Sequence, residues 1–117
     1  MFSGPYSYDS RFGEHQGTNP EQLIAAAQAG CFTMALASKL ATGGHPPELL
    51  RTNATVHLRM QDGSITLARL EIETEGRVKG IDEQQFSQYA EDAKATCPVA
   101  RALSGIPEIV LKAKLTG

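Results

Sequence analysis

The feature that most constrains this fold is residues 23–37, where apolar side chains occur on every face of an expected helix. Asn19 is a suitable N-cap and Pro20 takes the first helical position, while the glycines and prolines of residues 43–47 end the helix after about Leu40. A helix that is apolar all round must be covered all round. One small domain can hardly cover it alone, so we expect a second subunit to cover part of it.

Two alternating segments predict a β-hairpin after this helix. Residues 52–61 alternate apolar and polar side chains, and residues 64–78 form the return strand. The Asp62-Gly63 pair between them is a strong signal for a tight hairpin turn. The alternation changes phase within the return strand, so we expect a β-bulge near Ala68-Arg69 that keeps one apolar face.

A second helix is expected to begin at Asp82, because Gln85 can complete a capping box there. Pro98 breaks that helix and starts a short one that ends near Leu103, and residues 108–115 alternate again as a strand. The second helix carries one apolar stripe that ends in a thiol: Phe86, Ala90, Ala93 and Cys97. The predicted class is α+β, with an antiparallel sheet packed on a long, buried central helix.

Composition narrows the function classes. The chain has 117 residues, 41% hydrophobic and 21% charged, which is typical of one globular domain. The net charge is −2 and no basic block occurs, so we expect no nucleic acid partner. The apolar stretch of residues 23–37 is short for a bilayer span and no secretory signal is visible, so we expect no membrane partner and a cytoplasmic location.

The two cysteines, Cys31 and Cys97, form neither a CxxC motif nor a disulfide framework. A reactive thiolate needs positive potential or a helix N-terminus, and on that criterion Cys97, which would cap a short helix, ranks first. Cys31 lies mid-helix among alanines. Both thiols can equally be small buried hydrophobic groups. The histidines at 15, 45 and 57 lack the spacing of metal ligands, which disfavours a zinc site built with the cysteines.

Three blocks, residues 17–32, 80–83 and 93–102, resemble the osmotically inducible protein C and organic hydroperoxide resistance (OsmC/Ohr) family of thiol peroxidases in order and spacing. The Gly-Thr-Asn-Pro-Glu and Cys-Pro-Val blocks resemble the OsmC branch more closely. The resemblance implies an OsmC-like fold in an interlocked homodimer. Family members usually begin with further strands, so we expect residues 1–117 to form a single OsmC-like domain without these N-terminal strands.

The resemblance also implies roles for four residues. Cys31 matches the peroxidatic cysteine, Cys97 the resolving cysteine, Glu21 the glutamate of Asn-Pro-Glu, and Arg11 the arginine before that motif. An arginine held by a glutamate would favour the Cys31 thiolate. That thiolate would reduce an organic hydroperoxide, and hydrogen peroxide less well, to give a sulfenic acid. Cys97 would resolve it as a disulfide that an external dithiol reduces. No cofactor and no metal are implied.

Helix geometry constrains this implied site. Glu21 and Cys31 are ten residues apart on one helix, which separates them by about 15 Å along its axis. If both serve one active site, Glu21 must come from a partner chain, which predicts a homodimer with two interfacial sites. The alternative is a non-catalytic binding or interaction domain with unreactive thiols. In that case Glu21 only complements the helix dipole.

Overall fold

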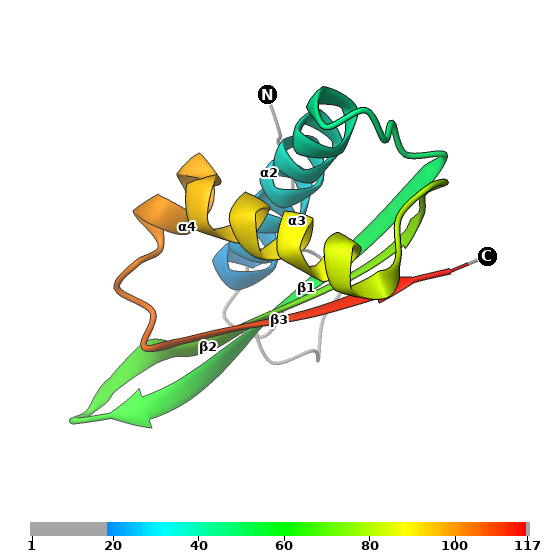
Figure 1. Cartoon of the computed structure of the whole chain (residues 1–117). Helices are drawn as coiled ribbons and strands as arrows, with labels where there is room; N and C mark the ends of the chain where they lie inside the picture. The colour runs from blue at the N-terminus through cyan, green and yellow to red at the C-terminus, as the bar shows by residue number, and fades with distance from the viewer. Residues whose placement is uncertain (1–18, 117) are drawn as a thin grey trace.

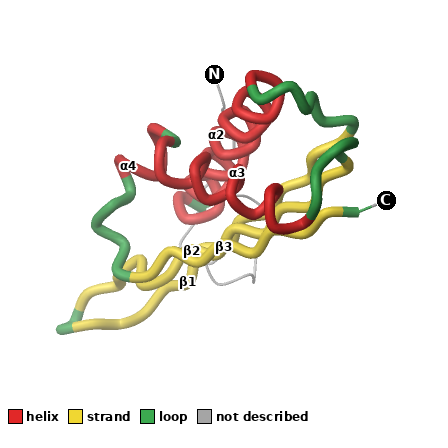
Figure 2. The backbone as a smooth tube through the Cα atoms, in the orientation of Figure 1, coloured by secondary structure: helices red, strands yellow, loops and turns green. Residues whose placement is uncertain are grey.

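The computed structural model describes residues 19–116 as a two-layer α+β fold. The sheet has three strands. The helices lie together on one of its faces, as Figures 1 and 2 show. In chain order the elements are α2 (Pro20–Thr42), β1 (Leu49–Gln61), β2 (Ser64–Arg77), α3 (Glu83–Thr96), α4 (Pro98–Ala102) and β3 (Glu108–Leu115). The long helix, the hairpin and the second helix therefore occur where the sequence predicts them.

Helix α2 begins and ends on its predicted signals. The Asn19 side chain accepts a hydrogen bond from the Gln22 backbone N–H at 2.9 Å, and the Gly43 N–H donates to the Lys39 carbonyl at 3.0 Å. The helix is long and apolar enough to cross a membrane by length and composition alone, a test that the core helix of a soluble protein also passes. Its fully or almost fully buried residues form one stripe: Ala25, Gln28, Phe32, Leu36 and Leu40.

Among the described residues, the rest of α2 is half-buried or exposed. Met34 is 75% exposed, and exposed small residues lie along the same side of the helix. The expectation that this helix is covered on every face is therefore met along one stripe only. Residues 19–116 leave an exposed apolar side on α2 that includes Ala27 and Met34.

The sheet is mixed, which corrects the predicted antiparallel arrangement. Its order is β1-β2-β3, with β1 antiparallel to β2 but β3 parallel to β2. The chain returns through α3 and α4 before β3, and such a crossover places the third strand in the same direction as the second. Alternation in the sequence identifies a strand and its faces, but it carries no information about direction.

The hairpin contains both the predicted tight turn and the predicted β-bulge. Asp62 and Gly63 have positive φ angles of 51° and 78°, which a turn of type I′ requires. In the register, His57 pairs with Arg69 and Leu58 with Leu67, so Ala68 is the extra residue of a β-bulge. The bulge restores one buried face to β2, as the change of phase predicts.

Helix α3 is fixed by its cap and by its buried stripe. Asp82 and Gln85 form the predicted capping box in both directions, with bonds of 2.8 and 3.1 Å. The stripe Phe86, Ala90, Ala93 and Cys97 is fully buried. Its first three members pack in one core with Leu70 and Ile72 of β2 and with three buried residues of α2: Phe32, Leu36 and Leu40.

The contact between β2 and α3 depends on a glycine. A Cβ atom at Gly76 would lie 2.6 Å from ring carbons of Phe86 and 3.1 Å from Leu50. We expect Gly76→Ala to lower the free energy of unfolding by about 1–3 kcal/mol through overpacking, measured by urea denaturation. Gly105→Ala is the matched control, because a Cβ there meets nothing within 4 Å. Equal effects of the two substitutions would contradict this account.

Candidate functional site

The structure brings the two cysteines together. Cys31 lies in the middle of α2 and is partly buried, whereas Cys97 lies between α3 and α4 and is fully buried. Their Sγ atoms are 2.7 Å apart, with the Cys97 S–H donating to the Cys31 sulfur, and both are free thiols. Two groups far apart in the chain therefore form one dithiol site.

Backbone hydrogen bonds as well as packing fix the position of Cys97. Its N–H donates to the Ala93 carbonyl at 3.0 Å, and its own carbonyl accepts from the Arg101 N–H at 3.1 Å. The residue is thus both the C-cap of α3 and the N-cap of α4, and Pro98 at the first position of α4 enforces the break. Since both helices contact α2, the sulfur of Cys97 is held against that helix.

Burial is the largest influence on the pKa of the Cys97 thiol. Loss of solvent raises the pKa of the Cys97 thiol, and its hydrogen bond with Cys31 raises the pKa further. The backbone N–H groups of Ala100 and Val99 bond its sulfur and lower the pKa, but they do not cancel the effect of burial. The helix N-terminus, on which the sequence ranked Cys97 first, is therefore outweighed by desolvation of its sulfur.

Gln28 is a polar member of this site that the sequence analysis did not identify. Its side chain is fully buried, and its Nε2 lies 3.8 Å from the Cys97 sulfur as a hydrogen-bond donor. Its Oε1 is buried and has no hydrogen-bond partner within residues 19–116. The signal in the sequence is a glutamine within the otherwise apolar run of residues 23–32, three residues before Cys31.

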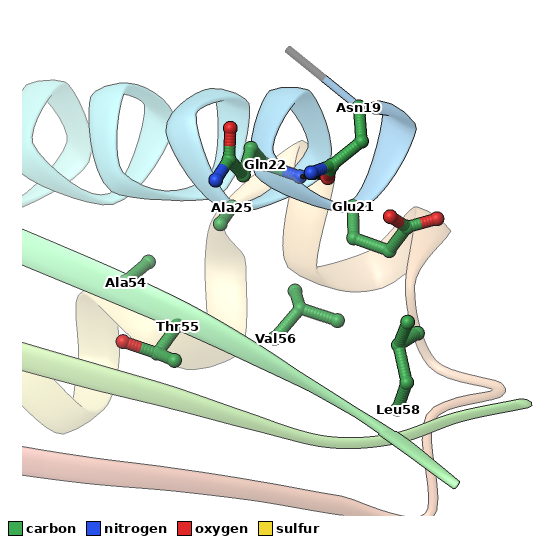
Figure 3. Close-up of a pocket in the computed structure, with 8 residues that line it drawn as sticks. All are labelled: Asn19, Glu21, Gln22, Ala25, Ala54, Thr55, Val56 and Leu58. Carbon is green, nitrogen blue, oxygen red and sulfur yellow. Dashed lines mark hydrogen bonds between the residues drawn. The ribbon is translucent and has the colours of Figure 1, made fainter. Parts of the chain in front are cut away.

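Glu21 lies apart from the dithiol in this subunit. It lines a pocket between the start of α2 and strand β1, which Figure 3 shows with Leu58 and the other lining residues. Neither cysteine lines that pocket. Arg11, the other residue expected in the site, lies outside the described residues. The structure of one chain therefore joins Cys31 to Cys97 and does not join Glu21 to them.

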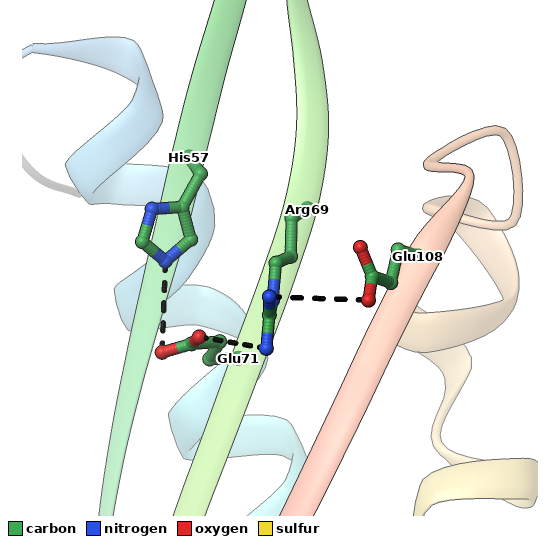
Figure 4. Close-up of polar contacts among 4 residues, drawn as sticks. All are labelled: His57, Arg69, Glu71 and Glu108. Atoms are coloured by element: carbon green, nitrogen blue, oxygen red, sulfur yellow. Dashed lines mark ion pairs between the residues drawn. The ribbon is translucent and has the colours of Figure 1, made fainter.

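A second polar cluster lies on the sheet face opposite the helices (Figure 4). His57 Nε2 is 3.5 Å from Glu71, and Arg69 contacts both Glu71, at 3.0 Å, and Glu108, at 3.9 Å. These groups are partly exposed, and ion pairs in such settings contribute little stability. In the described part of the chain, no three His, Cys, Asp or Glu side chains are placed to hold a metal ion.

Comparison with known proteins identifies the family. Residues 13–112 match the family model described as OsmC-like protein. The peroxiredoxin OsmC of Escherichia coli is 39% identical over 112 residues, which cover 96% of this chain and 73% of that protein. This chain belongs to the OsmC/Ohr family. An organic hydroperoxide resistance protein-like 1 of Staphylococcus saprophyticus is 31% identical, over 82% of this chain and 68% of its own length.

Solved structures share the OsmC-like fold. The organic hydroperoxide resistance protein OhrB of Bacillus subtilis superimposes with a TM-score of 0.69 at 24% identity, covering 95% of this chain and 79% of that one. An organic hydroperoxide resistance protein OsmC of Legionella pneumophila gives a TM-score of 0.69 at 23% identity, covering 92% and 77%. The OsmC-like architecture inferred from the three sequence blocks is confirmed.

The different depths of the two thiols in this OsmC/Ohr protein predict their order of labelling. Near neutral pH, iodoacetamide should modify Cys31 before Cys97, because Cys97 is fully buried and its pKa is raised by that burial. Peptide mass spectrometry over time measures both adducts, and labelling in urea serves as the control in which the rates converge. Modification of Cys97 first would contradict the described site.

Proposed function

We propose that this OsmC/Ohr protein is a two-cysteine peroxidase that reduces organic hydroperoxides with electrons from an external dithiol. The observation that carries the proposal is the contact of two free thiols, 2.7 Å apart, from distant parts of the chain. Family membership supports it, because the related proteins include a peroxiredoxin and organic hydroperoxide resistance proteins. Contact between two thiols is what a disulfide-forming cycle requires.

Cys31 is the first attacker in this proposal because it is the less buried of the two cysteines. The Cys31 thiolate attacks the distal oxygen of the hydroperoxide and the O–O bond breaks. The sulfur becomes a sulfenic acid, and the departing alkoxide takes a proton and leaves as an alcohol. Apolar neighbours on α2, such as Ala27 and Met34, favour alkyl hydroperoxides over hydrogen peroxide.

Cys97 then closes the cycle. Its sulfur attacks the sulfur of the Cys31 sulfenic acid, an S–S bond forms, the S–O bond breaks and water leaves with the proton of Cys97. Because the sulfurs are already in contact, only local adjustment is needed. The external dithiol reduces the disulfide by exchange and is itself oxidised, which returns two thiols.

The proposed activation of Cys31 uses a second subunit. Glu21 lies about 15 Å from Cys31 along α2 and lines a pocket that contains neither cysteine. A homodimer that pairs the open apolar side of α2 would place Glu21 of the partner subunit, holding an arginine that we assign to Arg11, beside Cys31. A guanidinium there would favour the thiolate. This arrangement uses the surface around Met34 that one chain leaves exposed.

Substitution of each cysteine separates the two chemical steps. Cys31→Ser should abolish consumption of cumene hydroperoxide, because the attacking sulfur is gone. Cys97→Ser should consume one equivalent and stop, because no intramolecular disulfide can form. Peroxide loss and mass spectra of the quenched protein measure both outcomes. Unchanged peroxide consumption by Cys31→Ser would exclude Cys31 as the attacking sulfur. No peroxide consumption by the wild-type protein would exclude the peroxidase and leave a binding domain with unreactive thiols.

The dimer is tested on the exposed side of α2. Met34→Lys should dissociate the dimer in analytical ultracentrifugation and reduce peroxidase activity at least about tenfold, because a charge is costly in an apolar interface. Met60→Lys is the matched control, since Met60 is 69% exposed at the hairpin end and Met34 is 75% exposed. A wild-type protein that is a stable monomer with full activity would refute the interfacial site.

A further inference from the structure

The least expected group in the dithiol site is the buried amide of Gln28. Gln28 and Cys31 are three residues apart on α2 and therefore share a helix face. The Gln28 side chain has no exposed surface, and its Nε2 donates to the Cys97 sulfur at 3.8 Å. The amide therefore reaches from the helix of one cysteine to the sulfur of the other.

The Gln28 amide is poorly hydrogen-bonded for a buried group. Its Oε1 is buried with no hydrogen-bond partner within residues 19–116, and burying an unpaired carbonyl costs free energy. Its Nε2 bonds to sulfur, which is a weak acceptor while it is a thiol. A methionine of similar length would fill the same space without either penalty. The amide is therefore better explained by a state of the site in which its donor has a stronger partner.

The resolving step produces such a state. To attack the Cys31 sulfenic acid, Cys97 must present an electron pair and develop negative charge at a position that water does not reach. The donors around that sulfur are the backbone N–H groups of Val99 and Ala100 and the Nε2 of Gln28. A hydrogen bond to an ionised sulfur is stronger than one to a neutral thiol.

We propose that Gln28 is a positioning residue of the resolving step, which holds the Cys97 sulfur on Cys31 and stabilises its developing charge through Nε2. The proposal rests on the proposed peroxidase function and adds a role to it. In this step the Cys97 S–H bond and the Cys31 S–O bond break, the S–S bond forms, and the proton leaves with the hydroxyl as water. Gln28 exchanges no electrons and stays unmodified.

Single-turnover kinetics of Gln28→Met test this role. Reduced protein is mixed with one equivalent of cumene hydroperoxide and quenched at intervals with dimedone, which traps sulfenic acid. Mass spectrometry then measures labelled Cys31 and the intramolecular disulfide. We expect peroxide loss at the wild-type rate, disulfide formation about tenfold slower, and accumulation of labelled Cys31. The stability of the reduced variant should be unchanged or higher, because the unpaired carbonyl is gone.

Gln88→Met is the matched control, because Gln88 is exposed on α3 and the substitution is the same. Peroxide loss and disulfide formation in Gln88→Met should both keep their wild-type rates. Disulfide formation at the wild-type rate in Gln28→Met would overturn the role of Gln28 and leave the peroxidase intact. A wild-type protein that forms no disulfide would instead overturn the proposed function itself. If Gln28→Met slows both peroxide loss and disulfide formation and also lowers stability, Gln28 has a purely structural role.

A measurement on the wild-type protein needs no variant that might fold poorly. In ¹H–¹⁵N spectra of the reduced and the peroxide-oxidised protein, the side-chain amide signals of Gln28 should shift between the two states, because their sulfur acceptor changes. They should also exchange slowly with solvent, since the group is buried. The Gln88 amide should do neither. Gln28 signals that are identical in both states would contradict the proposal.

Discussion

The packing of α3 across α2 is the contact on which the rest of the structure depends. The stripe of α3 that faces the core contains one large side chain, Phe86, followed by the small residues Ala90 and Ala93, so the helices approach closely where the stripe ends. The last position of that stripe is Cys97. Because the contact partner at that point is the middle of α2, the burial that forms the core also brings the sulfur of Cys97 onto Cys31.

The same packing gives the two thiols different chemical properties. A fully buried thiol resists ionisation, and for Cys97 this effect is larger than the effect of the N–H groups at the start of α4. Cys31 is only partly buried, so solvent reaches part of it. In the proposed cycle, the difference in burial favours Cys31 as the first attacker, whereas the helix N-terminus alone, which is visible in the sequence, favours Cys97.

The features that the sequence predicts correctly are those that neighbouring residues determine, and the features that it misses depend on residues far apart in the chain. The capping box at Asp82, the turn at Asp62-Gly63 and the bulge at Ala68 were predicted because residues within a few positions determine them. The direction of β3 was not, because alternation is the same in both directions. The contact of Gln28 with Cys97 joins residues far apart in the chain, and no local pattern encodes it. The pairing of the cysteines was implied only by the family resemblance.

In the proposed dimer, the exposed side of α2 is both the route to Cys31 and the surface that the second subunit covers. Ala27, Cys31 and Met34 follow one another at helical spacing, and the structure leaves Ala27 and Met34 exposed beside the partly buried thiol. The surface through which a hydroperoxide would reach Cys31 is thus the same apolar surface that the proposed second subunit would cover. In such a dimer the substrate must enter along the interface, between apolar walls from both chains. That geometry favours a hydroperoxide with an alkyl group, because the apolar walls then bury the alkyl group while the O–O bond lies at Cys31.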